Sequence, residues 1–196
     1  MAKPKNIQAF RKTRARLIDA GLALFRAKSF MSVGISEILN EAGAPKGSFY
    51  HYFSDKEDFG LAVAEAYHEQ QMQAANANFT KGSTSPVERL RDFFVTAKKD
   101  YESRNFADGC LMCNLSTELG DQNERFQVQL SRQWAELVTV IADNMDADCL
   151  QQLRLSHLNA SEAASLLLNS WSGALTRMKA DRSVEPLELF LRCYFC

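Results

Sequence analysis

Two cysteines three residues apart, Cys110 and Cys113, are the residues whose type and spacing most directly suggest chemistry. Such a pair can bind zinc, can cycle between dithiol and disulfide, or can present a reactive thiolate beside a second thiol. A zinc site needs two further ligands, but the histidines, His51, His68 and His157, are scattered, and the sequence has no second CxxC. We therefore predict no metal site and no cofactor.

The two remaining interpretations of the pair require different elements. A thioredoxin-like oxidoreductase places its CxxC at the end of a strand in a βαβ unit, and the sequence shows no such strand. A sensor needs only a helix start, where backbone N–H groups favour the thiolate. We expect Asp108 to cap a short helix over 109–119, with Cys110 in its first turn and Cys113 placed to resolve a sulfenic acid. Two small apolar residues in a buried helix remain the alternative.

Residues 34–56 predict two short helices around a tight turn, which is a helix-turn-helix. Apolar residues recur at helical spacing in the first helix, and Gly43 is expected to end it in the left-handed conformation. Pro45 begins the second helix, which buries Phe49 and Phe53 and enters the major groove of DNA. The residues expected at the DNA interface are Ser36, Lys46, Gly47, Ser48, Tyr50, His51, Tyr52 and Lys56.

The stretch AGAPKGSFYHYFSDKEDF, residues 42–59, resembles the signature of the TetR family of dimeric repressors. The resemblance implies a helical, ligand-binding C-terminal region and a homodimer that binds double-stranded DNA at a pseudo-palindromic operator. Two positions depart from the family pattern. Ser29 stands where a glycine commonly ends the first helix, and Gly34 stands where a Thr or Ser commonly caps the second, so backbone amides must bind phosphate there alone.

A second stretch, GCLMCNLSTE at 109–118, resembles a motif of the TetR branch that represses N-ethylmaleimide reductase and acrylate-utilisation genes, and residues 182–187 match another motif of that branch. The resemblance implies a reactive electrophile or an unsaturated acid as inducer. The family cysteine carries over to Cys110 only. The resolving role of Cys113 is our inference from its position one turn away.

Charge and composition fit this interpretation. Residues 1–56 hold ten Lys or Arg against four Asp or Glu, a net charge of +6, whereas residues 57–196 carry −7. A basic head on an acidic body places positive potential where the helix-turn-helix lies. The chain has no apolar run long enough to span a bilayer and no apolar leader, so we expect a cytoplasmic protein with no membrane contact, its five cysteines reduced.

The chain is expected to be all-α, with a helix-turn-helix domain at 1–56 and a helical sensor and dimerisation domain at 57–196. We expect a mobile arm at 1–12, a helix at 13–28, a long helix from a capping box at 54–57 to about Phe79, and a loop at 80–85 before a second capping box. Asp121 is expected to cap a helix near 124. In the helix over 160–179, the second apolar stripe, Ala163, Leu167, Ser170 and Ala174, predicts a homodimer interface.

The leading hypothesis is a transcriptional repressor that leaves its operator when a small molecule or a cysteine-reactive electrophile or oxidant acts on it. The alternative from another class is a thiol oxidoreductase using Cys110 and Cys113. An enzyme does not require the basic head, so we predict no enzymatic activity. A DNA-binding architectural protein without an inducer is the third possibility.

Overall fold

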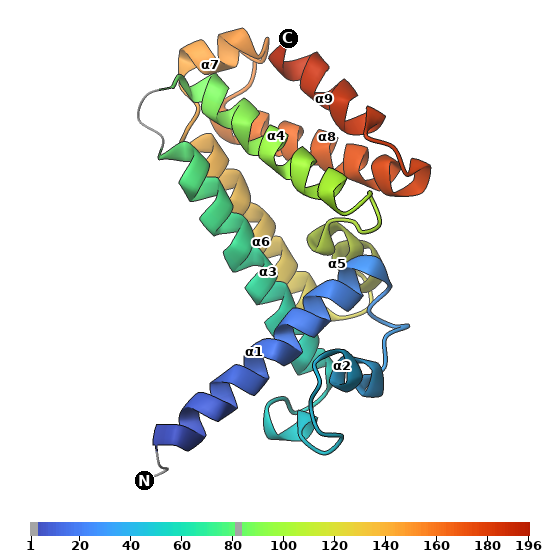
Figure 1. The fold of residues 1–196 in the computed structure, drawn as a ribbon. Helices are drawn as coiled ribbons and strands as arrows, with labels where there is room; N and C mark the ends of the chain where they lie inside the picture. Colours follow the sequence, from blue (N-terminus) through green and yellow to red (C-terminus); the bar gives the residue numbers. More distant parts are fainter. Residues whose placement is uncertain (1–3, 81–83) are drawn as a thin grey trace.

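The structure is a computed structural model that describes residues 4–80 and 84–196 (Figure 1). Every regular element in these ranges is a helix, which confirms the predicted all-α class. In chain order the elements are α1 (Pro4–Ala27), α2 (Ile35–Glu41), the 3-10 helix η1 (Phe49–His51), α3 (Lys56–Phe79), α4 (Pro86–Ser103), α5 (Leu111–Leu119), α6 (Glu124–Ala142), α7 (Ala147–Gln152), α8 (Ala160–Asp181) and α9 (Glu185–Phe195).

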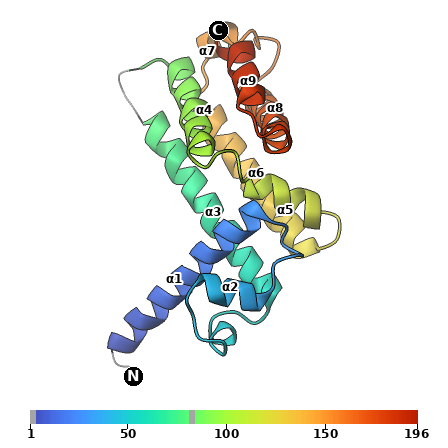
Figure 2. The same ribbon diagram turned by 45° about the vertical axis from the view of Figure 1, so that its right-hand side comes forward.

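The helices form a head and a body joined by one long helix. α1, α2 and η1 lie at one end, and α4, α7, α8 and α9 gather at the other (Figures 1 and 2). α3 runs from the head into the body beside α6, while α5 lies between the end of α1 and the body. None of the helices in 4–80 and 84–196 combines the length and apolar character needed to cross a bilayer.

Two hydrophobic cores hold this arrangement together. The head core contains buried residues from α1, α2 and η1 together with the first half of α3, α5 and the start of α6. The body core contains buried residues from the second half of α3 and from α4 and α6 to α9. The head core thus draws residues from both sides of the predicted domain boundary at residue 56, and that boundary stays a prediction.

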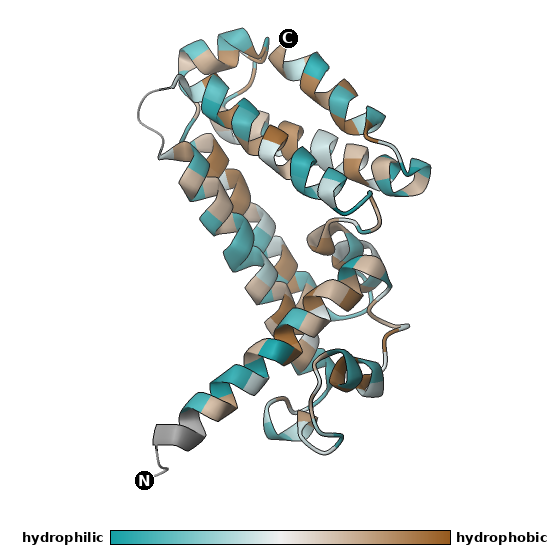
Figure 3. Ribbon diagram, in the orientation of Figure 1, coloured by the Kyte–Doolittle hydropathy of each residue, from teal (hydrophilic) through white to brown (hydrophobic). Residues whose placement is uncertain are grey.

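The first helix begins earlier than the sequence suggested. The prediction of a mobile arm over 1–12 is wrong for residues 4–12, which belong to α1, while residues 1–3 lie outside the described part of the chain. No glycine or proline interrupts residues 5–20, and the ring of Phe10 packs 4.4 Å from that of Tyr52. Figure 3 shows mostly hydrophilic residues along the part of α1 that extends beyond the other helices.

Several predicted caps are shifted in the structure. Asp55, not Ser54, caps α3 by accepting from the Asp58 N–H, because only Asp55 directly precedes the helix. Asn123, not Asp121, caps α6 through the Phe126 N–H. The capping box of Ser85 and Glu88 at α4 is confirmed.

The second helix of the predicted helix-turn-helix is reduced to consecutive turns and η1 within residues 45–53, called here the recognition segment. Gly47 has low helix propensity, and the hydroxyl of Ser48 donates to the Pro45 carbonyl at 2.8 Å, which competes with helical bonding. The burial of Phe49 and Phe53 is confirmed. Gly43 follows α2 with φ of +57°, the left-handed conformation expected from the sequence.

Candidate sensor site and DNA-binding surface

Cys110 lies where the two cores meet. Its half-buried side chain packs against both the head core and the body core, as does that of Trp134. It is the N-cap residue of α5, and its thiol makes no capping hydrogen bond, although the N–H groups of Met112 and Cys113 are close enough to favour its thiolate. The hydroxyl of Tyr67, on α3, donates to the Cys110 Sγ across 3.7 Å. Cys110 is therefore in contact with the elements that join head to body.

The two thiols of the pair have opposite acidities. The Cys113 thiol donates to the Cys110 sulfur and, with backbone N–H groups of α5 and the Tyr67 hydroxyl, lowers the pKa of Cys110 to about 6, against the opposing effect of burial. The hydrogen bond to Cys110, then burial and then the negative charge on Cys110 raise the pKa of Cys113 well above its ordinary value. Burial first, and then the Cys110 charge, raises the pKa of Tyr67. Cys110 is thus the more acidic of the two thiols, and Cys113 is the one that keeps its proton.

Asp108 does not cap α5, in contrast to the sequence prediction. Its carboxylate lies 3.4 Å from the Nε of Arg26 and 2.9 Å from the Nε of Arg104, so it is held by two guanidinium groups outside the helix. Arg26 also lies 3.9 Å from Asp100 and 5.7 Å above the ring of Tyr67. This ion-pair network joins the end of α1 to α4 and to the segment that carries Cys110.

Cys110 borders two hollow regions. A partly enclosed cavity of about 290 Å³ lies between α3, α4, α6 and α8. Its mostly apolar walls include Phe93, Trp134 and Trp171, and Arg26 and two tyrosines lie at the Cys110 end. An open groove of about 460 Å³ runs along α5 on the other side, between the end of α1 and α8. A molecule in either space can reach Cys110.

Five of the eight residues predicted to contact DNA are exposed in the head. These are Ser36, Lys46, Gly47, Tyr50 and His51, on α2 and the recognition segment. Tyr50 is 67% exposed. The structure therefore brings a cation, polar tips and an aromatic ring to one end of the molecule.

The other three, Ser48, Tyr52 and Lys56, are half-buried and make contacts within the protein. Tyr52 packs on Phe10. The ammonium of Lys56 donates to the Phe30 carbonyl at 2.6 Å and lies 4.5 Å from the Phe30 ring centroid. Burial lowers the pKa of Lys56, and the negative charge of Glu118 works against this shift.

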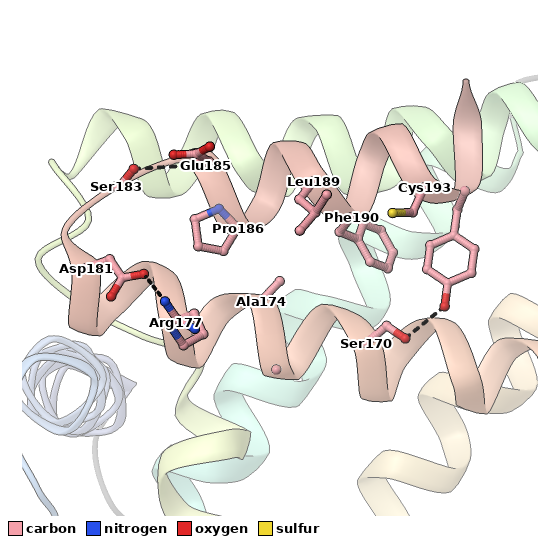
Figure 4. A pocket seen from close by; sticks show the side chains of 12 residues that line it. Ser170, Ala174, Arg177, Asp181, Ser183, Glu185, Pro186, Leu189, Phe190 and Cys193 are labelled. Atoms are coloured by element: carbon pink, nitrogen blue, oxygen red, sulfur yellow. Dashed lines mark hydrogen bonds and ion pairs between the residues drawn. The ribbon is translucent and has the colours of Figure 1, made fainter.

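α8 and α9 share an open face with a groove of about 600 Å³ between them (Figure 4). Leu189 and Cys193 of α9 are exposed there, and Ser170 and Ala174 line it from α8. The predicted second stripe is only partly correct, because Ala163 and Leu167 are fully buried within the subunit against the body core. An ion pair of Arg177 with Asp181 closes one end of the groove.

Sequence reasoning missed the polar residues that surround Cys110. Arg26 and Tyr101 come from α1 and α4, and neither spacing nor motif separates them from surface charge and core aromatics. Glu118 appeared only as one letter of a motif. Within residues 4–80 and 84–196, no group of three or more His, Cys, Asp or Glu is arranged to hold a metal ion.

Comparison with known proteins places this geometry in a family. Residues 17–63 match the model described as bacterial regulatory proteins, tetR family, and residues 86–194 match the tetracyclin repressor-like C-terminal domain. Transcriptional regulator AcuR of Cereibacter sphaeroides is 36% identical over 91% of this chain and 81% of its own length. HTH-type transcriptional repressor NemR of Escherichia coli is 29% identical over 90% of this chain and 88% of its own.

Solved structures agree. The regulatory protein TetR from Rhodobacter sphaeroides superimposes with a TM-score of 0.85 at 34% identity, covering 91% of this chain and 94% of the other. The reduced form of Escherichia coli NemR gives a TM-score of 0.75 at 28% identity, covering 92% and 93%. With both halves matched and the helical head and body in place, the chain belongs to the TetR family of DNA-binding transcriptional repressors.

Proposed function

We propose that this repressor leaves its operator when Cys110 is modified by an electrophile or an oxidant. The observation that carries the proposal is the state of the Cys110 sulfur, which lies at the junction of head and body with its pKa lowered to about 6. A thiolate is the reactive form of cysteine, and at neutral pH this one is largely deprotonated. The relation to NemR, solved in a form described as reduced, supports a redox role.

The chemistry needs no group beyond the pair and the reagent. With an activated alkene, the Cys110 sulfur donates its electron pair to one alkene carbon, and the carbanion formed on the neighbouring carbon takes a proton from water. With hypochlorous acid, the sulfur gains oxygen as a sulfenic acid while chlorine is reduced to chloride. The Cys113 thiol then attacks that sulfur, releasing water and forming a Cys110–Cys113 disulfide.

Operator recognition is assigned to the exposed end of the head. Lys46, Gly47, Tyr50 and His51 of the recognition segment would meet the major groove, and Ser36 the phosphate backbone. Ser48, Tyr52 and Lys56 would contact phosphate only at the rim, since the polar groups of Ser48 and Lys56 already have partners in the protein and the ring of Tyr52 packs on Phe10. The net charge of +6 over residues 1–56 supports binding at this end.

TetR-family regulators act as dimers, and we assign the contact here to α8 and α9. The groove of Figure 4 leaves Leu189 54% exposed, although most large apolar side chains of this chain are buried. A second copy related by a two-fold axis would cover this face and place two heads on the half-sites of a pseudo-palindrome.

The test measures operator binding by fluorescence anisotropy before and after treatment with N-ethylmaleimide, with the adducts located by mass spectrometry. We expect wild type to lose at least about tenfold in operator affinity, a coupling of ~1.4 kcal/mol, and Cys110→Ala to keep its affinity. Cys196 is an exposed cysteine, and Cys196→Ala serves as the matched control, which should respond as wild type does.

A non-covalent inducer is the second candidate, and the partly enclosed cavity of about 290 Å³ beside Cys110 favours it. Release of Cys110→Ala from DNA as readily as wild type would exclude the thiol as the sensor and leave this candidate. The thiol oxidoreductase alternative loses support, because the family is one of regulators and the pair lies at the start of a helix rather than after a strand.

A further inference from the structure

One side of α5 connects the reactive cysteine to the DNA-binding head. Cys110, Asn114 and Glu118 follow one another at four-residue spacing, so they lie on the same side of the helix. All three line the open groove between α5, the end of α1 and α8. A group attached to the Cys110 sulfur on the groove side would therefore lie along this row.

The far end of the row holds the turn between α1 and α2. The Glu118 carboxylate accepts from two successive backbone N–H groups, that of Phe30 at 2.8 Å and that of Met31 at 2.7 Å. From the other side, Lys56 donates to the carbonyl oxygens of the same two residues, at 2.6 and 3.4 Å. Both N–H groups and both carbonyls of the 30–31 turn are thus held by charged side chains.

The near end of the row holds the last turn of α1. The Asn114 amide donates to the carbonyls of Phe25 and Arg26, both at 3.4 Å, and the Gly109 N–H also donates to the Arg26 carbonyl at 3.4 Å. The segment around Cys110 therefore contacts the head at two successive points, of which the Glu118 contacts are the shorter.

We propose that Glu118 is the residue that couples Cys110 to the recognition segment. The inference rests on the proposed function and names the path by which modification of Cys110 weakens DNA binding. A displaced α5 withdraws the Glu118 carboxylate, which frees the N–H groups of the 30–31 turn and removes the charge opposite Lys56. α2 and the start of α3 lose their fixed spacing to α1, and the recognition segment lies between them.

The packing around Phe30 makes the response discrete rather than gradual. The Phe30 ring lies 5.1 Å from that of Phe25 and 5.4 Å from that of Phe126. A Cβ built on Gly60 would come within 2.5 Å of the ring, so no larger side chain fits there. Close packing of this kind permits separate arrangements and resists small deformation.

The test compares Glu118→Gln with Glu69→Gln, an exposed glutamate on α3 that serves as the charge-matched control. A glutamine offers one acceptor where the carboxylate offered two, and its amide N–H groups oppose the backbone N–H groups of the turn. We expect unmodified Glu118→Gln to bind the operator about tenfold more weakly than wild type, and alkylation of Cys110 to weaken it no further. Glu69→Gln should bind and respond as wild type does.

Two controls separate coupling from misfolding and from failure of the sensor proposal. Circular dichroism and the rate of Cys110 alkylation should match wild type, since Glu118 does not touch the sulfur. If Glu118→Gln binds the operator as wild type does and is released by alkylation to the same extent, the coupling role is excluded. If wild type itself is not released, the sensor proposal fails. The affinity of unmodified Glu118→Gln then still tests whether the hydrogen bonds of Glu118 to the 30–31 turn support DNA binding.

Amide hydrogen exchange of the wild-type protein gives a second measurement that needs no variant. The Phe30 and Met31 N–H groups should exchange slowly in the reduced protein and faster after alkylation of Cys110, because Glu118 then no longer protects them. Unchanged exchange at both amides in a protein that alkylation has released from DNA would overturn the proposal.

Discussion

The head core and the body core are packed in different ways. The head core contains a chain of six phenylalanines, Phe25, Phe30, Phe49, Phe53, Phe59 and Phe126, with neighbouring ring centroids 4.9 to 5.8 Å apart. The body core has a comparable aromatic cluster, with ring centroids 4.8 to 5.6 Å apart, but it also surrounds a cavity of about 290 Å³, bordered by side chains such as Phe93 and Leu168. A densely packed core resists small deformation, whereas a core with a cavity can admit a ligand and rearrange. The head can therefore change only between discrete arrangements, whereas the body has room to adjust around its cavity.

A matched pair of truncations gives the largest expected effect. Phe59→Ala, in the head core, should reduce the free energy of unfolding by about 3–5 kcal/mol, because Phe59 is fully buried among other aromatic rings. Phe93→Ala should cost about 1 kcal/mol less, since Phe93 already borders the cavity and loses fewer packed neighbours. Urea unfolding measures both. An equal or larger loss for Phe93→Ala would contradict the difference between the cores.

A second pair of variants, in which a small buried side chain is replaced by a larger one, should show a smaller difference in stability between the two cores. Ala64→Leu inserts atoms into the packed head core, where Ala64 is fully buried, and should cost about 1–3 kcal/mol. Ala97→Leu places the same atoms beside the cavity and should change stability by less than about 1 kcal/mol. Thermal unfolding in one buffer compares them. If Ala97→Leu is the more destabilising of the two, the cavity is not available space.

The smallest effect concerns two cysteines in different surroundings and leaves stability unchanged. The pKa of Cys110, at the junction of the cores, is lowered to about 6, whereas burial in the body core raises the pKa of Cys149 to about 11. Alkylation of Cys110 should therefore proceed at a constant rate above pH 7 and fall about tenfold per pH unit below 6, as the thiolate is protonated. Cys149 should stay unmodified over this range. Peptide mass spectrometry after short pulses distinguishes them, and a Cys110 rate still rising at pH 8 would show an ordinary thiol.

The sequence predicted the class of fold because helical periodicity and capping residues are local signals. The spacing of Phe49 and Phe53 predicted their burial, and the residue types at Ser85 and Glu88 predicted the capping box. The site around Cys110 was only half predictable, because Arg26, Tyr67 and Tyr101 come from three helices and meet by tertiary packing alone.

The errors share a cause. Asp108 was assigned to the helix that follows it, whereas Arg26 of α1 and Arg104, four residues before it, hold its carboxylate. Ala163 and Leu167 were assigned to a partner subunit, although neighbouring helices of the same chain cover them. In each case the local pattern correctly predicted the type of environment of the side chain. It could not predict which element of the structure provides that environment.

Because the Cys110 thiol makes no capping hydrogen bond, the choice of residue that replaces it affects the stability of α5. Serine is among the best residues at a helix N-cap, and a serine hydroxyl there accepts an N–H bond worth about 0.5–2 kcal/mol. The customary conservative replacement, Cys110→Ser, would therefore strengthen the start of α5 as well as remove the thiol. On the proposed mechanism, such an allele should bind the operator without being released by electrophiles, and a screen for uninducible mutants should recover serine at this codon more often than alanine.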